Sequence, residues 1–162
     1  MAVDAFLKLD DLKGESIDAK HKDEIEVLSW SWGETNGPTS NPGAGLGSGK
    51  VAFQDFHFTS RLQRSSPKLF LACASGEHFK KAVLTMRKAG GSQQDFYKVT
   101  FEDVLVSSFQ QAASSDSHES TALEQISLNF AKIEITYTVQ NSKGTTGETV
   151  SASWDIKKNT GG

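Results

Sequence analysis

The sequence has little cysteine, little proline and no excess of positive charge. Its 162 residues include one cysteine, Cys73, and three prolines. A single cysteine cannot form an internal disulfide, and two further ligand residues do not stand near it at zinc-finger spacing, so the chain suits the reducing cytosol. Lys and Arg number 17 against 20 Asp and Glu, a net charge of −3. This balance argues against nucleic acid and anionic lipid as partners.

Long hydrophobic runs are also missing. The first residues read MAVDAFLKLDDLKGES, in which Asp4 and Lys8 interrupt what would be the apolar core of a signal peptide. No run of roughly 18 apolar residues occurs anywhere, so the sequence predicts no membrane insertion. We expect neither a cleaved signal peptide nor general secretion. Export would therefore require a dedicated machine.

Short segments with alternating apolar residues dominate what is present. They cover residues 6–9, 24–32, 50–61, 82–88, 96–109, 125–139 and 149–157. Such segments, separated by turn-forming residues, are typical of antiparallel strands. The length fits a single domain, residues 1–162. The sequence therefore predicts a mainly β protein, an antiparallel barrel or sandwich of two sheets.

One helix is predicted, over residues 66–75. Ser66 is the expected N-cap, Pro67 the first helical residue and Gly76 the residue just past the end. Leu69 and Phe70 fall on the side expected to pack on a sheet.

Two segments are predicted to be loops. Residues 33–49 contain six glycines and two prolines, which predicts a long, extended, exposed loop. This loop is not a phosphate-binding loop, because Ala44 replaces the first glycine of that motif and a strand follows instead of a helix. Residues 110–120, rich in Ser, Gln and Ala, form the second predicted loop.

The apolar positions change parity within several predicted strands. In 24–32, for example, Ile25 and Val27 share one side, whereas Leu28, Trp30 and Trp32 share the other. A β-bulge, a strand that crosses between two packed sheets, or a strand buried on both sides by oligomerisation would each explain the change. These three explanations remain open from the sequence.

No arrangement of residues suggests catalysis or metal binding. The four histidines lie in different predicted elements, Cys73 has no cationic neighbour on its helix, and Glu102 and Asp103 point to opposite faces of one strand. We expect no catalytic residue, no metal and no cofactor, and hence no enzyme. The histidines are His21, His57, His78 and His118.

Seven segments together resemble a known family. They are MAVDAFLKLDDLKGES, VLSWSWG, DFHFTSRLQRSSPKLFLACASGEH, TMRKAGG, EDVLVSS, ISLNFAKIEITY and WDIKKN. In this order they resemble the haemolysin-coregulated protein (Hcp) family, the tube subunits of the bacterial type VI secretion system. The resemblance spans nearly the whole chain.

The resemblance implies a β-barrel subunit of a structural assembly. Six copies would close into a ring, and rings would stack into a hollow tube that is made in the cytoplasm and exported by the type VI system without a cleaved signal peptide. The implied partners are other copies of the chain, the sheath and spike, and effector proteins carried or chaperoned in the lumen.

The resemblance and the strand pattern together suggest roles for particular residues. In the extended loop, Asn36, Thr39, Asn41 and Leu46 are candidates for contacts with the next ring. Ser29 and Ser31 are candidates for the lumen wall, although Ile25 and Val27 on their side favour the core equally. Candidates for the core or a subunit interface are Trp30, Trp32, Phe56, Phe58, Phe130 and Trp154.

A monomeric, lipocalin-like barrel is the main alternative from another functional class. In that interpretation the strand with Trp30 and Trp32 would line an apolar cavity for a small ligand. The mass in solution distinguishes the two interpretations.

Overall fold

The computed structural model describes residues 3–41, 44–88, 93–115, 122–140 and 146–162. The described residues form antiparallel strands and one short helix, which confirms the predicted fold class. In chain order the elements are β1 (Val3–Leu9), β2 (Ile25–Glu26), β3 (Ser29–Ser31), β4 (Glu34–Asn41), β5 (Ala44–Phe53), β6 (Phe56–Arg61), α1 (Ser66–Ser75), β7 (His78–Lys88), β8 (Asp95–Ala113), β9 (Ala122–Asn129), β10 (Lys132–Gln140), β11 (Thr146–Asp155) and β12 (Thr160–Gly161).

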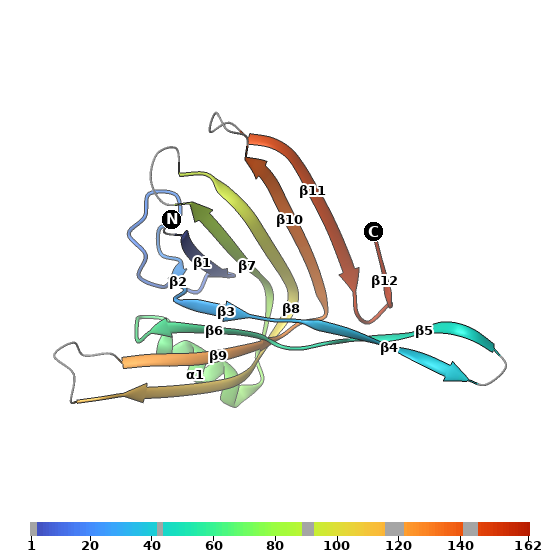
Figure 1. Ribbon diagram of the computed structural model, residues 1–162. Helices are drawn as coiled ribbons and strands as arrows, with labels where there is room; N and C mark the ends of the chain where they lie inside the picture. The colour runs from blue at the N-terminus through green and yellow to red at the C-terminus, as the bar shows by residue number, and fades with distance from the viewer. Residues whose placement is uncertain (1–2, 42–43, 89–92, 116–121, 141–145) are drawn as a thin grey trace.

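One long strand, β8, joins the two halves of the fold. Its first part pairs with β7 and β10, in what we call the large arm, which has the strand order β12-β11-β10-β8-β7-β1-β2. Its second part pairs with β9, which continues through β6 to β3 and forms the small arm. The strand bends near Asp103, which has a φ of 54°, and its register shifts between Val106 and Ser108. The arms diverge from this bend without closing into a barrel (Figure 1).

Steps from one arm to the other explain the parity changes. The segment 24–32 is broken at Val27 and Leu28, whose N–H groups donate to Ala5 O of the large arm and Thr59 O of the small arm, respectively. The predicted strand 125–139 is split in the same way at 130–131, between β9 of the small arm and β10 of the large arm. The predicted strand 50–61 is split at 54–55, where β5 of the two-stranded β4–β5 sheet is followed by β6 of the small arm. Of the three explanations, crossing between two packed layers therefore accounts for the changes without a partner.

The core lies where the two arms face each other near the bend. Aromatic rings meet there, with centroid distances of 4.9 Å between Phe56 and Phe101 and 4.7 Å between Phe101 and Phe130. Farther along the small arm, α1 covers the inner face and buries Leu69 and Ala72. Burial of these side chains is the main force that holds the arms together.

The extended segment 33–49 is a paired ribbon instead of a loop without secondary structure. Strands β4 and β5 pair from Glu34 with Phe53 to Asn41 with Ala44, with two register shifts between. Both edges of this two-stranded ribbon are free, so a proline can occupy a strand position without removing a needed hydrogen bond, and the shifts absorb the mismatch. The ribbon extends well beyond the rest of the molecule (Figure 1).

Residues 110–113 also belong to a strand, where a loop was predicted. Gln110 pairs with Gln125 and Ala113 with Ala122, so β8 continues beside β9. Pairing with a neighbouring strand outweighs the weak intrinsic preference of Gln and Ala for strands. Residues 116–120 of the predicted loop lie outside the described residues.

The helix has the predicted bounds, but its first turn differs from the prediction. The N-cap position is occupied by Ser65, while the Ser66 hydroxyl accepts from Gln63 N–H at 2.9 Å and donates to the Glu124 carboxylate at 3.0 Å. Gly76 ends the helix with a φ of 71°, as predicted. The Phe70 ring contacts Phe109 of β8 at a centroid distance of 6.3 Å, as expected for a residue that packs on a sheet, but it remains 59% exposed because Leu69 and Ala72 form the buried side of the helix.

Candidate assembly surfaces

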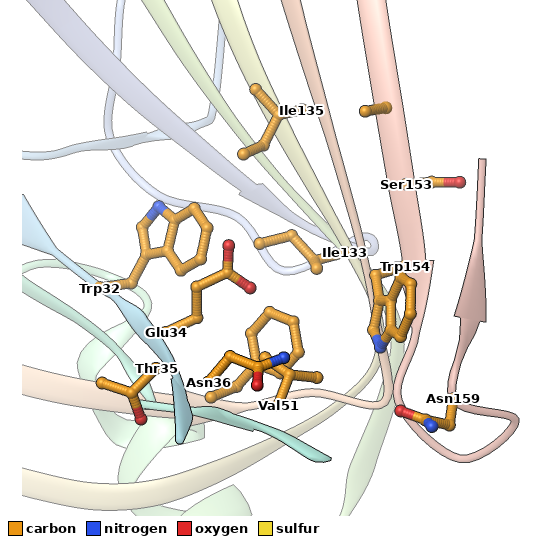
Figure 2. A pocket seen from close by; sticks show the side chains of 12 residues that line it. Trp32, Glu34, Thr35, Asn36, Val51, Ile133, Ile135, Ser153, Trp154 and Asn159 are labelled. Carbon is orange, nitrogen blue, oxygen red and sulfur yellow. The ribbon is translucent and has the colours of Figure 1, made fainter. Parts of the chain in front are cut away.

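An open apolar cleft lies between the large arm and the base of the ribbon. Its volume is about 590 Å³. The side chains that line it are Trp32, Glu34, Thr35, Asn36, Val51, Phe53, Ile133, Ile135, Ala152, Ser153, Trp154 and Asn159. Figure 2 shows residues from the ribbon on one wall and residues from β10 and β11 on the other. Seven of these twelve side chains are apolar, so the cleft suits a mainly apolar occupant.

The cleft exists because the two arms diverge. Three opposed pairs follow one another along the inner face of β10 and β11, each two residues beyond the last. They are Ile133 with Trp154, Ile135 with Ala152, and Tyr137 with Val150. Ile133 is only 4% exposed, whereas Tyr137 is 46% and Val150 54% exposed. The apolar side of β10 and β11 therefore continues past the region that the small arm covers, and Tyr137 and Val150 remain exposed there.

The other side of the same two strands is polar. Thr136 and Ser151 are hydrogen-bonded at 3.1 Å, and Thr138 and Thr149 at 3.3 Å. Alternation within β10 and β11 therefore gives one face that is suited to water and one that is not. The exposed apolar strip formed by Tyr137 and Val150 indicates a surface that another molecule covers.

A second surface, which we call the hydroxyl face, is the outer face of the small arm. Two cross-strand rows form it, and both run from β3 through β6 and β9 to β8. The first row is Ser31, His57, Ser127 and Ser108, and the second row is Ser29, Thr59, Gln125 and Gln110. Apart from His57, none of these eight side chains is ionisable. His57 Nδ1 is hydrogen-bonded to Ser127 Oγ.

The two predicted lumen residues, Ser29 and Ser31, are exposed on the hydroxyl face. Trp30 between them points the other way and packs against Phe56 and Tyr97, with centroid distances of 6.1 and 6.2 Å. Because the chain changes arms between Ile25 and Ser29, the apolar residues before the break do not share a face with the serines. The sequence left this orientation open.

The other predicted residues are distributed over the core, the cleft and the ribbon. Phe56, Phe58 and Phe130 are buried, and Trp30, Trp32 and Trp154 are half-buried. Asn36 is exposed on β4 and lines the cleft. Thr39 and Asn41 pair with Gly47 and Ala44 in the ribbon, and Leu46 lies in β5; the side chains of these three candidates lie outside the described part.

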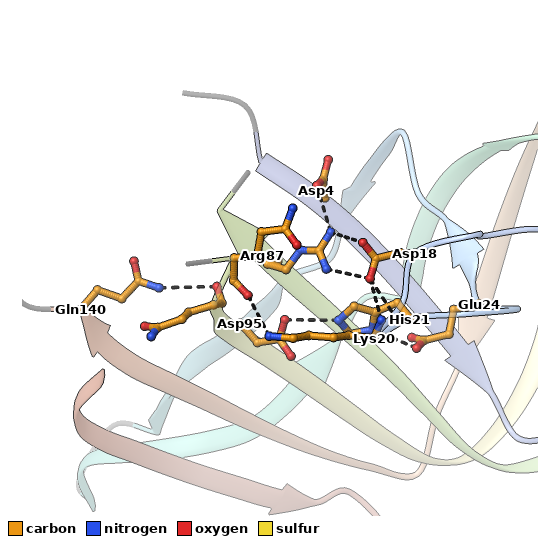
Figure 3. A network of polar contacts seen from close by, with 10 residues as sticks. Asp4, Asp18, Lys20, His21, Glu24, Arg87, Asp95 and Gln140 are labelled. Atoms are coloured by element: carbon orange, nitrogen blue, oxygen red, sulfur yellow. Dashed lines mark hydrogen bonds and ion pairs between the residues drawn. The ribbon is translucent and has the colours of Figure 1, made fainter. Parts of the chain in front are cut away.

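A polar network that the sequence did not indicate fixes the segment between β1 and β2. Arg87, only 3% exposed, donates to Asp18 through both terminal nitrogens and to Asp4 at 3.4 Å (Figure 3). The hydrogen bonds from Arg87 hold the pKa of Asp18 well below its ordinary value, and those to Asp18 raise the pKa of Arg87. The partners are 69 residues apart, so no local pattern reveals them.

His21 anchors the same segment. Its ring nitrogens lie 2.9 Å from a Glu24 carboxylate oxygen and 3.2 Å from an Asp95 carboxylate oxygen. The ring stacks on Phe6 with a centroid distance of 4.5 Å. Together with Asp18, these contacts tie the segment to β1, β7 and β8.

Metal-ligand clusters and membrane-spanning helices are both absent from the part of the chain that the structure describes. Within the described ranges, no group of three or more His, Cys, Asp or Glu side chains is arranged to hold a metal ion. The helix found there is not long and apolar enough to cross a membrane.

Comparison with known proteins gives the family. The family described as type VI secretion system effector, Hcp, matches residues 6–137. The chain belongs to the Hcp family. The resemblance seen in the sequence is thereby confirmed, and the chain is an Hcp protein of type VI secretion.

Individual relatives cover almost the whole chain. Protein hcp1 of Pseudomonas aeruginosa is 43% identical over 161 residues, 98% of each protein. The crystal structure of Hcp1 from Salmonella typhimurium is 40% identical with a TM-score of 0.83 and covers 99% of each chain. A structure of a type six secretion system protein, 30% identical, has a TM-score of 0.92 and covers 99% of this chain and 100% of its own.

Proposed function

We propose that this Hcp-family chain is the structural subunit of a tube. Six copies close into a ring, the rings stack, and the hollow tube is exported by the type VI machine. The observation that carries the proposal is the apolar strip on β10 and β11, which the chain itself leaves open, at 46% exposure for Tyr137 and 54% for Val150. Burial of such surface against identical copies supplies the driving force for assembly.

A ring can form if the apolar strip of one copy is covered by a different surface of the next copy. A patch that meets an unlike patch on the next copy is a heterologous contact, which gives a ring when the rotation closes. Each subunit in a ring is held by two interfaces, so modest contacts suffice for a stable assembly.

The hydroxyl face is suited to the lumen wall. Its serine, threonine and glutamine side chains can exchange hydrogen bonds with water and with a cargo protein, and they provide no apolar anchor of the kind that dominates tight interfaces. Ser29 and Ser31 are the residues through which the lumen would hold effector proteins, loosely enough for release.

The ribbon is suited to contacts between rings. It projects beyond the arms, and its residues Asn36, Thr39, Asn41 and Leu46 would dock on the next ring. We expect the stacking contacts to be weaker than those within the ring, which would allow the tube to come apart after delivery.

The tube subunit works by assembly instead of by catalysis. It is made in the cytoplasm, assembles with the sheath and spike, and leaves the cell without a cleaved signal peptide. Nucleic acid is not among its partners, since the net charge is −3.

Electron microscopy of the purified protein in negative stain tests the proposal. Hollow rings with sixfold symmetry are expected. Compact particles of single-chain size would contradict it and would favour the small-ligand alternative, for which a cleft of about 590 Å³ is large enough.

A single substitution tests the lumen assignment. Ser31→Gln should leave rings intact and reduce the amount of effector that purifies with them, because the longer side chain would project into the lumen and displace the bound effector. Intact rings with undiminished cargo, or rings that fail to form, would contradict the placement of Ser31 in the lumen.

A further inference from the structure

The most exposed large apolar side chain on the described surface is Ile17, at 94% exposure. It lies in a polar segment between β1 and β2. Two other exposed apolar residues, Val3 and Leu28, line the same shallow depression. We call these three side chains the isoleucine patch.

The backbone on both sides of Ile17 is held in place. Ser16 N–H donates to Glu24 O at 3.1 Å, and Ser16 O accepts from Asp23 N–H at 2.8 Å. On the other side, Asp18 binds the buried Arg87 side chain and accepts from the N–H groups of Lys20 and His21. Ile17 is therefore presented by a fixed backbone, which lowers the entropy lost when it binds.

The isoleucine patch and the apolar cleft lie at opposite edges of the large arm. The patch adjoins β1 and β2, at one end of the strand order, and the cleft adjoins β10 and β11, toward the other end. Two copies placed side by side in the same orientation would bring the patch of one next to the cleft of the other. That is the heterologous relation that a ring requires.

Charge makes a smaller contribution than apolar contact. The depression around Ile17 is lined by Asp4, Asp18 and Glu26 against one cation, Arg87. Beside the cleft, the exposed Lys158 can attract this acidic depression, whereas Lys157 is already bound to Asp103 at 2.9 Å and the carboxylate of Glu34 lines the cleft itself. The fit between the two surfaces therefore rests on their apolar side chains.

From these observations we infer that Ile17, with Val3 and Leu28, packs into the apolar cleft of a second copy of this chain. The inference rests on the proposed ring and identifies the two surfaces that close it. Each subunit then offers one patch and one cleft, and neither surface is satisfied within its own chain.

Two substitutions, one on each surface, test the inference by sedimentation velocity. Ile17→Asp places a carboxylate on the patch, and Ala152→Arg fills the cleft; both positions are exposed, so the folded chain tolerates them. Each variant alone should sediment as a single chain of 17.6 kDa. Mixed in equal amounts, they should form a dimer of about 35 kDa, because each retains the surface that the other lacks, and should go no further.

Matched variants separate assembly from folding. Lys22→Ala lowers the net charge by one on the same segment, as Ile17→Asp does, and should keep the wild-type mass. Ile17→Ser removes the apolar side chain without adding charge and should also dissociate the ring. Circular dichroism should show the wild-type β signal for each variant.

The outcomes distinguish the inference from the proposed function. Rings formed by wild type and by Ile17→Asp alike would overturn the inference and leave the proposed ring standing. Dissociated single variants that do not pair on mixing would overturn the assignment of patch to cleft. A wild type that sediments as a single chain would overturn both.

Discussion

The hydroxyl face and the β10–β11 strip are both exposed sides of strand pairs, yet they differ in what they require. The hydroxyl face presents Ser29, Ser31 and their neighbours, whose polar groups water can satisfy. The strip presents Tyr137 and Val150, which are roughly half exposed. Each Å² of apolar surface left in water costs about 25 cal/mol. The hydroxyl face can therefore stay in contact with water, whereas the strip gains free energy when another molecule covers it.

The first prediction breaks the contrast by making the strip polar. Tyr137→Asp combined with Val150→Asp places two charges on directly opposed residues of β10 and β11 and should reduce the assembly to single chains, a sixfold loss of mass by light scattering. The matched control, Thr136→Asp with Ser151→Asp, alters an opposed pair on the polar side of the same strands. It should keep the assembled mass; equal behaviour of the two variants would refute the contrast.

The second prediction concerns the core that both arms share. Phe56→Ala should lower the free energy of unfolding by about 3–5 kcal/mol, because Phe56 is fully buried and contacts Phe101. Phe70→Ala, at a 59% exposed position, should cost less than about 1 kcal/mol. Urea unfolding in the dissociated Tyr137/Val150 background keeps assembly out of the measurement. Equal losses of unfolding free energy in Phe56→Ala and Phe70→Ala would contradict this account of the core.

The third prediction concerns the support of the small arm by the helix. The Glu124 carboxylate, fully buried, accepts from Ser60 Oγ at 3.3 Å, Ser66 Oγ at 3.0 Å and Gln111 Nε2 at 3.4 Å. Glu124→Ala leaves buried hydroxyls without an acceptor and should cost about 1–3 kcal/mol in urea unfolding. Glu124→Gln keeps one acceptor oxygen and should cost less. A larger loss in the glutamine variant would contradict this account of the site.

The fourth prediction concerns the segment that carries Ile17. Because Arg87 lowers the pKa of Asp18, their ion pair stabilises the folded chain above the ordinary aspartate pKa of 3.8 and loses this effect as the pH falls below it. Asp18→Asn should therefore flatten the fall in urea midpoint between about pH 5 and pH 2. Asp11→Asn, at an exposed position of the same segment, is the control and should keep the wild-type slope. An unchanged slope in Asp18→Asn would show that the pair does not contribute.

Much of the secondary structure could be predicted from local patterns. Alternation located the strands, and Pro67 with Gly76 located the helix, because these signals act over a few residues. The ribbon was not predicted because its glycines and prolines argue against strands. Pairing of β4 with β5 nevertheless forms a ribbon, since a two-stranded sheet tolerates proline at its free edges. The N-cap was misplaced by one residue because the partner of Ser66 is Glu124, 58 residues away.

The candidate surfaces were only partly predictable. The aromatic and β-branched residues of the cleft stood out in the sequence, and so did the two serines of the hydroxyl face. The exposure of the cleft residues depends on how the two arms diverge from the bend near Asp103, which no strand pattern encodes. Ile17 gave no signal either, because a single isoleucine in a polar segment becomes informative only when its neighbours are seen to be anchored.

The mass of the unmodified chain in solution tests the central claim most directly. Sedimentation equilibrium over a range of protein concentrations should give six chains of 17.6 kDa, about 106 kDa. A mass of one chain at every concentration would contradict the claim that copies of this chain cover the apolar surface it leaves open.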